Sequence, residues 1–460
     1  MPAALRYYTD QTTTDARTIE EQYSREYDGR KALLEQHWAY YDGVMHAPLK
    51  VEADQVNDNV LLPKVGELAD RIRAFLLGEG VAFDASGDGQ RSAQDEAIAA
   101  LWQANRGNLL QQQIALSGIL GGHCFVRVEP RQGQYPRLVN LDPRYCSVFW
   151  DMSDYERVLW YRLQYTLGSE GKRVDYVRWS AVEERGDPDL WVEYVYQRTH
   201  NLAAWELAKG PEAMEYLPLV DWQNDSRPFR YYGADDVSRA IALNDAANLI
   251  ASDYNRILKH HASPKTVVIG ANAQDIKAAV GGLYSINKSS TDVSVFNLEM
   301  QSDLKQSYEF LLFTLRELWS SGRMVDPATV RDKLGQLTNF GLRVMMGDTL
   351  AKIDEKRTLY GEGFQRVNQL ALQLMGQAAP AGVKVQWPDV LPEDAAEVQS
   401  ALMPEMEAGI ISKQTYREIR GYDQEQEEER IKAEQAGQDD LGTRLLAAFE
   451  SGGASNGQRQ

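Results

Sequence analysis

Hydrophobic and polar positions alternate most informatively between residues 234 and 262, where their spacing predicts one long helix. At about 1.5 Å per residue this helix would be about 43 Å long. Its apolar side chains form two separate stripes, one through Val237, Ala240, Ile241 and Ala251 and the other through Leu243, Ala246, Ile250 and Ile257. A helix with two apolar faces is typical of packing between two copies of itself, or of a central position inside one large domain.

The residues at both ends of this segment support the helix. Residues 219–233 are predicted to be a loop that leads into it, and Asp235 and Asp236 lie where a helix N-terminus favours negative charge. Basic residues at 259–261 lie in the last turn, and Pro264 cannot continue the helix. His260 and His261 could bind a metal ion, but we assign them to the helix end.

The rest of the chain mixes helical and strand patterns, which predicts an α+β fold. Helical spacing covers residues 15–41, 62–77, 94–120, 304–319 and 340–375. Strand alternation covers residues 123–129, 137–141, 158–165, 173–179, 190–199, 203–207, 265–270, 293–297 and 384–387. Residues 276–283 separate two of these strands in a small α/β insertion. Pro392 begins a helical acidic region in which Ser412 is a predicted N-cap, and residues 451–460 are predicted to be disordered.

Several segments resemble the portal proteins of tailed bacteriophages of the siphophage type. The sequences VDWQNDSRPFRYYG, LNDAANLIASDYNRI and SPKTVVIG are similar to the region where the portal chain enters its stem. Residues 59–83, 121–151 and 408–435 also resemble that family, in the same order. No single segment is an invariant chemical signature, so the order and spacing of the segments carry the resemblance.

The resemblance implies a division of the chain into the parts of a portal subunit. These parts are the wing (1–232), a stem helix (233–262), the clip (263–303), a second stem helix (304–321), the tunnel loop (322–340), a long helix with a strand returning to the wing (341–391), the crown (392–450) and a tail (451–460).

The resemblance also implies a function and a set of partners. A dodecameric ring at one capsid vertex would form the channel through which double-stranded DNA is packaged and ejected. It would bind the terminase, the major capsid and scaffold proteins, and the head–tail connector proteins. The chain would be made in the host cytoplasm and reside in the virion. The alternative is another phage structural component, such as a connector or minor capsid protein; chain length and the helix, insertion, helix order favour the portal.

Composition limits the chemistry that we expect. The chain of 460 residues carries a formal net charge of −18, which argues against a surface that wraps nucleic acid by neutralising phosphates. An acidic channel wall would instead let DNA slide, although the charge could equally serve solubility. We find no phosphate-binding loop, catalytic triad, metal-ligand spacing or membrane-spanning run. We therefore expect no enzyme activity, cofactor, metal site or membrane partner; a hydrolase that uses the acidic residues would require a carboxylate cluster that the sequence does not reveal.

Two groups of residues are candidates for function. The resemblance places the first group in the channel, where polar side chains can meet phosphates without reading sequence: Arg323, Arg331, Lys333, Gln336 and Asn339. Each of these could instead be an ordinary loop residue, or a salt-bridge partner of Asp326 or Asp332. The second group lies on the two-faced helix and is expected to contact a neighbouring subunit: Ile241, Ile250 and Ile257.

Overall fold

The computed structural model describes residues 16–49, 57–85, 92–150, 154, 156–167, 170–178, 190–200, 204–262, 265–269, 283–286, 294–298, 304–333, 339–377, 382–390, 402–419, 427–428 and 430–432. The chain divides into two compact units, Met1–Val390 and Leu391–Gln460, and each is described by itself. No helix in the described part combines the length and the apolar character that crossing a lipid bilayer requires.

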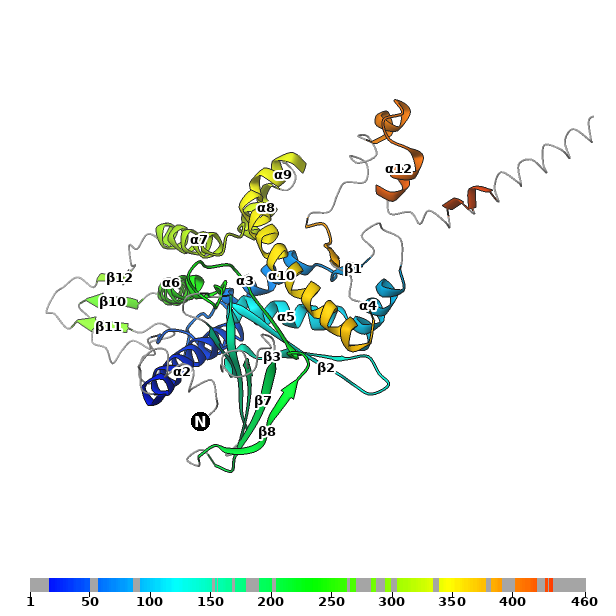
Figure 1. Cartoon of the computed structure of the whole chain (residues 1–460). Coiled ribbons are helices and arrows are strands. Elements are labelled where there is room, and N and C mark those ends of the chain that lie inside the picture. Colours follow the sequence, from blue (N-terminus) through cyan, green and yellow to red (C-terminus); the bar gives the residue numbers. More distant parts are fainter. Residues whose placement is uncertain are drawn as a thin grey trace, which may run out of the picture. The chain divides into compact units, whose positions relative to one another are not determined.

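Helices and small, mainly antiparallel sheets are interspersed along the first unit, which confirms the α+β prediction (Figure 1). Its helices are α2 (Ala16–Tyr41), α3 (Lys64–Leu77), α4 (Ala93–Ala104), α5 (Asn108–Gly121), η1 (Pro143–Tyr145), α6 (Ser238–Ala262), α7 (Leu304–Ser321), α8 (Pro327–Lys333), α9 (Asn339–Met345) and α10 (Gly347–Leu374). In the second unit α12 (Lys413–Ile419) is described, and the amide of Thr415 donates to Ser412 Oγ at 3.0 Å, which confirms the predicted N-cap.

The described strands form four small sheets. They are β1 (Ala82–Asp84), β2 (His123–Glu129), β3 (Arg137–Leu141), β4 (Cys146–Trp150), β5 (Val158–Leu167), β6 (Glu170–Arg178), β7 (Trp191–Arg198), β8 (Glu206–Met214), β9 (Leu219–Gln223), β10 (Lys265–Ile269), β11 (Leu283–Ile286), β12 (Ser294–Leu298) and β13 (Lys384–Gln386). The strand orders are β3-β2-β9, β4-β5-β6-β7-β8, β11-β10-β12 and β1-β13. All pairs are antiparallel except β10 with β11, which is parallel.

The main hydrophobic core lies where α5 and α10 cover the sheet β3-β2-β9 and α3 packs against both of these helices. Tyr360 and Phe364 of α10 are fully buried there and contact Trp222 of β9. A second hydrophobic cluster lies between the sheet β3-β2-β9 and the five-stranded sheet, and it includes Phe125 and Tyr161. Helix α10 packs against α3, α4, β2, β9 and β13, so it is held along much of its length.

Two predicted helices are each interrupted in the structure. The segment predicted over residues 94–120 divides into α4 and α5 because Arg106 and Gly107 have φ values of 70° and 50°. Just before the break, Asn105 Oδ1 accepts from the amide of Leu138 at 2.9 Å, so the interruption also anchors β3. The segment predicted over residues 340–375 divides into α9 and α10 at Met346, whose side chain is buried.

Several strand predictions need correction. Residues 219–223, predicted as part of a loop, form β9, because Asp221 and its neighbours pair with the central strand β2. Strand β8 covers Glu206–Met214 rather than residues 203–207. Most of its side chains are exposed, so buried and exposed positions do not alternate along it. Strands β1, β4 and β11 were not predicted. Residues 276–282 and 451–460 lie outside the described residues, so those two predictions stay open.

Candidate functional site

The segment proposed for the channel begins at a tight turn after α7. The amides of Gly322 and Met324 both donate to the carbonyl of Trp319, at 3.1 and 3.0 Å. Arg323 between them has a φ of 55°, a left-handed conformation that is unfavourable for residues other than glycine. The turn ends α7 and directs the chain into α8.

Arg323 is held by a carboxylate on α10. Its Nη1 lies 2.7 Å from Glu355 Oε2 and its Nη2 lies 3.2 Å from Glu355 Oε1, which is a bidentate pair. The pairing raises the pKa of Arg323 and lowers that of Glu355. Arg323 therefore forms a salt bridge, but with Glu355 and not with Asp326 or Asp332, the partners considered from the sequence.

Helix α10 also binds the backbone of this turn. Lys352 Nζ donates to the carbonyl of Gly322 at 2.6 Å. Thr349 Oγ1 donates to the carbonyl of Arg323 at 3.1 Å and accepts from the amide of Val325 at 3.2 Å. Because Lys352 and Thr349 are both buried, these contacts fix where the segment leaves the folded body.

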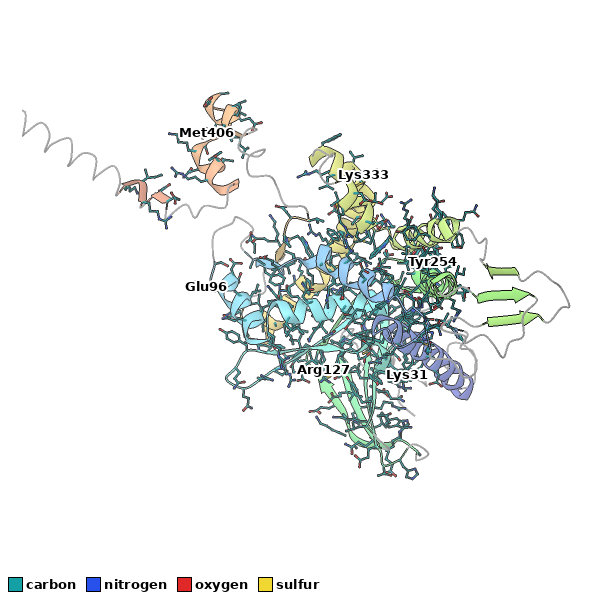
Figure 2. The ribbon with its side chains drawn as sticks, turned by 180° about the vertical axis from the view of Figure 1, so that it is seen from behind. Lys31, Glu96, Arg127, Tyr254, Lys333 and Met406 are labelled. Carbon is teal, nitrogen blue, oxygen red and sulfur yellow. The ribbon has the colours of Figure 1, made fainter. Side chains whose placement is uncertain are left out.

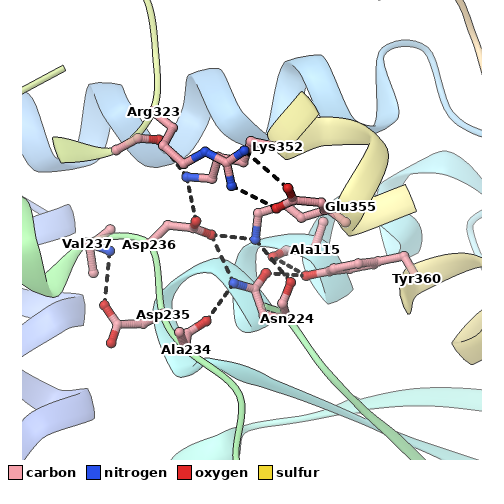
Figure 3. A network of polar contacts seen from close by, with 12 residues as sticks. Ala115, Asn224, Ala234, Asp235, Asp236, Val237, Arg323, Lys352, Glu355 and Tyr360 are labelled. Carbon is pink, nitrogen blue, oxygen red and sulfur yellow. Dashed lines mark hydrogen bonds and ion pairs between the residues drawn. The ribbon is translucent and has the colours of Figure 1, made fainter. Parts of the chain in front are cut away.

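Asp236 connects the same part of α10 to the start of α6 (Figure 3). Its carboxylate lies 2.7 Å from Lys352 Nζ and 2.8 Å from Lys356 Nζ, and all three side chains are buried. Its amide donates to the carbonyl of Ile119 on α5 at 2.9 Å. Asp236 therefore joins the start of α6 to α5 through its amide and to α10 through its carboxylate.

Asn224 and Tyr360 complete the hydrogen bonding of this network. Asn224 Nδ2 donates to Asp236 Oδ2 and to the carbonyl of Ala234, both at 2.9 Å. Tyr360 donates to Asn224 Oδ1 at 2.8 Å, and Lys356 Nζ donates to the carbonyl of Asn224 at 3.1 Å (Figure 3). Buried charges are tolerated when their polar atoms find partners in this way.

The ionisation of the network follows from burial and charge. Burial alone would raise the pKa of Asp236, but Lys356 and Lys352 outweigh it and lower this pKa to about 2. Burial lowers the pKa of Lys352, and Asp236 opposes that shift. Asp236 is therefore ionised at neutral pH, which keeps the buried network paired.

The structure separates the five channel candidates. Arg323 is fixed at the turn, whereas Arg331 and Lys333 lie exposed in the last turn of α8 (Figure 2). Gln336 lies outside the described residues, and Asn339 begins α9 but its side chain is not among those described. Asp326, which was considered as a salt-bridge partner of the channel candidates, pairs with Arg316: its Oδ2 lies 3.9 Å from Arg316 Nε.

The two-faced helix packs against α7 in antiparallel fashion. Tyr254 near the end of α6 contacts Tyr308 near the start of α7, with ring centroids 6.3 Å apart. Ile241, Ile250 and Ile257 are all partly buried within the single chain, and Ile241 packs against the main core. The more exposed apolar positions of α6 are Leu249 and Leu258, each more than 40% exposed.

One face of α6 is polar rather than apolar and binds an extended segment of the chain. Asn248 Oδ1 accepts from the amide of Leu62 at 2.8 Å, and Asn244 Oδ1 accepts from that of Lys64 at 3.0 Å. Ser252 Oγ accepts from the amide of Val60 at 3.0 Å. The three side chains are buried and spaced four residues apart, so they supply backbone partners to one strand-like segment.

The outer face of α7 carries aromatic side chains. Phe310 and Phe313 are more than half exposed and stack on each other, with ring centroids 6.2 Å apart. The side of the helix that faces the body buries Thr314, Leu318 and Trp319. The α6–α7 pair therefore has an inner face against the body and an outer face with apolar groups.

Sequence analysis assigned Asp235 and Asp236 the same role, but the structure divides them. Asp235 Oδ1 accepts from the amides of Val237 and Ser238, at 3.0 and 2.6 Å, as a helix cap does. Asp236 turns inward to Lys352 and Lys356, and the described helix begins at Ser238 rather than at residue 234. The available signal was the four-residue spacing of the two lysines, on the same face as buried Tyr360.

The sequence of the chain matches one known protein family. The sequence model of the family described as "Phage portal protein, SPP1 Gp6-like" matches residues 5–440, which is nearly the whole chain. No curated protein matches the chain. The chain therefore belongs to the SPP1 Gp6-like family of phage portal proteins, which are structural, non-enzymatic components of the capsid vertex that serve DNA packaging.

Proposed function

We propose that this chain forms a dodecameric ring at one capsid vertex, with a central channel for packaging and ejecting double-stranded DNA. The observation that carries this proposal is the order of α6, the three-stranded sheet β11-β10-β12 and α7, followed by the turn that α10 anchors. Residues 233–262 and 304–321 are the stem in this proposal, and residues 263–303 are the clip. Residues 1–232 with 341–391 form the wing and its associated long helix, and residues 392–450 form the crown.

Residues 322–340 are the tunnel loop of the proposed ring. The Asp236 network supports this role because it fixes the base of the segment, at the carbonyl of Gly322, while Arg331 and Lys333 remain exposed. Exposed cations on a short helix can contact phosphates of any sequence as DNA passes. The net charge of −18 per chain supports weak contact elsewhere, since an acidic wall repels the duplex.

Subunit contact in the proposed ring involves the outer face of the α6–α7 pair. Ile250 and Ile257 of α6 are only partly covered in the single chain, and Phe310 and Phe313 of α7 add exposed aromatic surface. Burying such groups against a neighbouring subunit would remove apolar area from water, at about 25 cal/mol per Å². The clip is the proposed docking platform for the terminase and the head–tail connector proteins, while the outer surface of the ring meets the major capsid and scaffold proteins.

Native mass spectrometry combined with negative-stain images of the same purified sample tests the proposal. We expect a ring of about a dozen chains around an open channel, because closed rings are the usual outcome of repeated head-to-tail contacts. A monomer or dimer over a wide range of concentrations would contradict the proposed assembly.

A further inference from the structure

Strand β1 has one edge that is only partly paired. It forms its two-stranded sheet with β13 along the other edge. On the partly paired edge the side-chain amide of Gln111 binds Val81 as a neighbouring strand would: its Oε1 accepts from the amide of Val81 at 2.9 Å, and its Nε2 donates to the carbonyl at 3.2 Å. Further along the same edge, Asp95 Oδ1 accepts from the amide of Ala85. Side chains of α5 and α4 therefore occupy the two ends of this edge.

Phe83 lies between the two occupied ends. Because the backbone groups of alternate residues in an antiparallel strand face opposite edges, the amide and carbonyl of Phe83 face the same edge as those of Val81 and Ala85. Neither group has a hydrogen-bond partner within the described part of the chain. One residue of an extended chain can exchange two hydrogen bonds with Phe83, whereas the side chains of Gln111 and Asp95 prevent a longer strand from pairing.

A cavity of about 620 Å³ lies along this edge, between β1 and α4 (Figure 1). Phe83 and Trp102 both line it, and their rings stack with centroids 5.3 Å apart and planes 18° apart. A residue that pairs with Phe83 places its side chain on the same face of the strand as the Phe83 ring. The cavity therefore offers backbone groups to a main chain and aromatic rings to one side chain, which is the way in which sheet edges bind peptides.

The charge of the cavity favours a cationic side chain. Asp84, Asp95 and Glu96 line it, and its described lining includes no lysine, arginine or histidine. Asp84 lies opposite Lys384 in the sheet, so Asp95 and Glu96 in the first turn of α4 supply the negative charge. A guanidinium group can lie flat on an aromatic ring while its N–H groups donate to a carboxylate, and the compact ammonium of lysine lacks this planar geometry.

We propose that this cavity binds one arginine of an extended peptide segment from a partner protein. The backbone of that arginine exchanges two hydrogen bonds with Phe83. Its guanidinium lies beside the rings of Phe83 and Trp102 and donates to the carboxylate of Glu96. The site uses neither the α6–α7 pair nor the proposed clip and tunnel loop, so the inference does not depend on the ring assembly proposed above.

Two capped tripeptides test the site in the full-length chain. They are acetyl-Ala-Arg-Ala-amide and acetyl-Ala-Gln-Ala-amide, which differ only in the central side chain. Each is added to about 10 mM, which would occupy most of a site with a millimolar dissociation constant. Isothermal titration calorimetry measures the dissociation constants, and hydrogen–deuterium exchange measures protection of the Phe83 amide.

Two variants test the proposed contacts. Glu96→Lys reverses a charge of the cavity, whereas Ala99→Trp fills the cavity from an exposed position of α4 without changing its charge. Glu362→Lys is the matched control for the charge reversal, because Glu362 is exposed on α10 and does not line this cavity. Circular dichroism shows whether each variant is folded.

We expect the arginine peptide to slow exchange of the Phe83 amide and to bind about tenfold more tightly than the glutamine peptide. Glu96→Lys should weaken binding of the arginine peptide about tenfold, because like charges then meet in the cavity. Ala99→Trp should abolish binding of both peptides, and Glu362→Lys should change neither. The inference is overturned if the native chain binds the two peptides equally or binds neither. It is also overturned if folded Glu96→Lys weakens binding no more than Glu362→Lys does. The peptide comparison uses the native chain, so it decides the matter even if a variant unfolds.

Discussion

Lys352 of α10 and Asp236, which precedes α6, form a buried ion pair in which Nζ and Oδ1 lie 2.7 Å apart. The same Nζ donates to the carbonyl of Gly322 at 2.6 Å, at the base of the proposed tunnel loop. The position of that loop therefore depends on a carboxylate just before α6, and the start of α6 and the end of α7 share one anchor on α10.

Removing the charge of Asp236 should destabilise the chain strongly. In Asp236→Asn the buried ammonium groups of Lys352 and Lys356 lose their counter-charge, and breaking a buried pair in this way costs about 3–5 kcal/mol. Asp235→Asn is the control, since asparagine caps a helix about as well as aspartate and should cost less than about 1 kcal/mol. Urea unfolding of both variants measures the difference, and equal midpoints would contradict the role assigned to Asp236.

The contribution of Asp236 to the free energy of unfolding should also depend on pH. The pKa of Asp236 in the folded chain is about 2, below the ordinary value of 3.8. Its stabilising contribution is therefore fully present above about pH 4 and is lost as the pH falls through about 2. The difference in unfolding free energy between the native chain and Asp236→Asn should be constant near neutral pH and narrow below about pH 4. A difference that stayed constant down to pH 2 would argue against this linkage.

The polar face of α6 should stabilise the segment that it binds. Asn248→Ala removes the acceptor of the partly buried amide of Leu62, and leaving such a donor without a partner costs at most about 1–3 kcal/mol. Exchange of the Leu62 amide with deuterium should become faster. Leu249→Ala, at the exposed neighbouring position, should change stability by no more than about 0.5 kcal/mol and leave that amide protected.

Neutralising the exposed cations of α8 should impair packaging but not assembly. Arg331→Ala combined with Lys333→Ala removes two proposed phosphate contacts, while ring formation uses other surfaces. The measurement is the fraction of DNA-filled particles in a packaging reaction. The control is the same double neutralisation at Lys172 and Lys209, which are exposed on β6 and β8. If particles that carry the α8 variant fill with DNA normally, Arg331 and Lys333 do not contact the DNA as proposed.

A charge on the two-faced helix should prevent or strongly weaken ring assembly. Ile250 is partly buried in the single chain, and Ile250→Asp would place an unpaired charge in the proposed subunit contact, which is costly. Native mass spectrometry reports assembly. Circular dichroism shows whether the variant chain has unfolded. Unfolding would explain a loss of ring assembly without a subunit contact at Ile250. Leu207→Asp, at an exposed position of β8, should assemble normally.

Sequence patterns predicted the elements that depend on local spacing. The predicted bounds of β2 and β3 agree with the structure, because alternation over five to seven residues is enough to mark a half-buried strand. The breaks at Gly107 and Met346 were missed, since uninterrupted helical periodicity continues across both of them. Asn105 shows why: its bonds to the distant residues Pro136 and Leu138 help to fix the first break.

The sequence by itself determined the class of fold, most helices and strands, and the resemblance to the portal family, because these depend on the order of residues along the chain. The tertiary structure decided which charged side chains form ion pairs. Lys352 and Lys356 resemble exposed helix residues until Asp236 is brought beside them, and Arg323 resembles a free channel cation until it meets Glu355. The physical reason is that the environment of a charge depends on neighbours that only folding brings within a few ångströms.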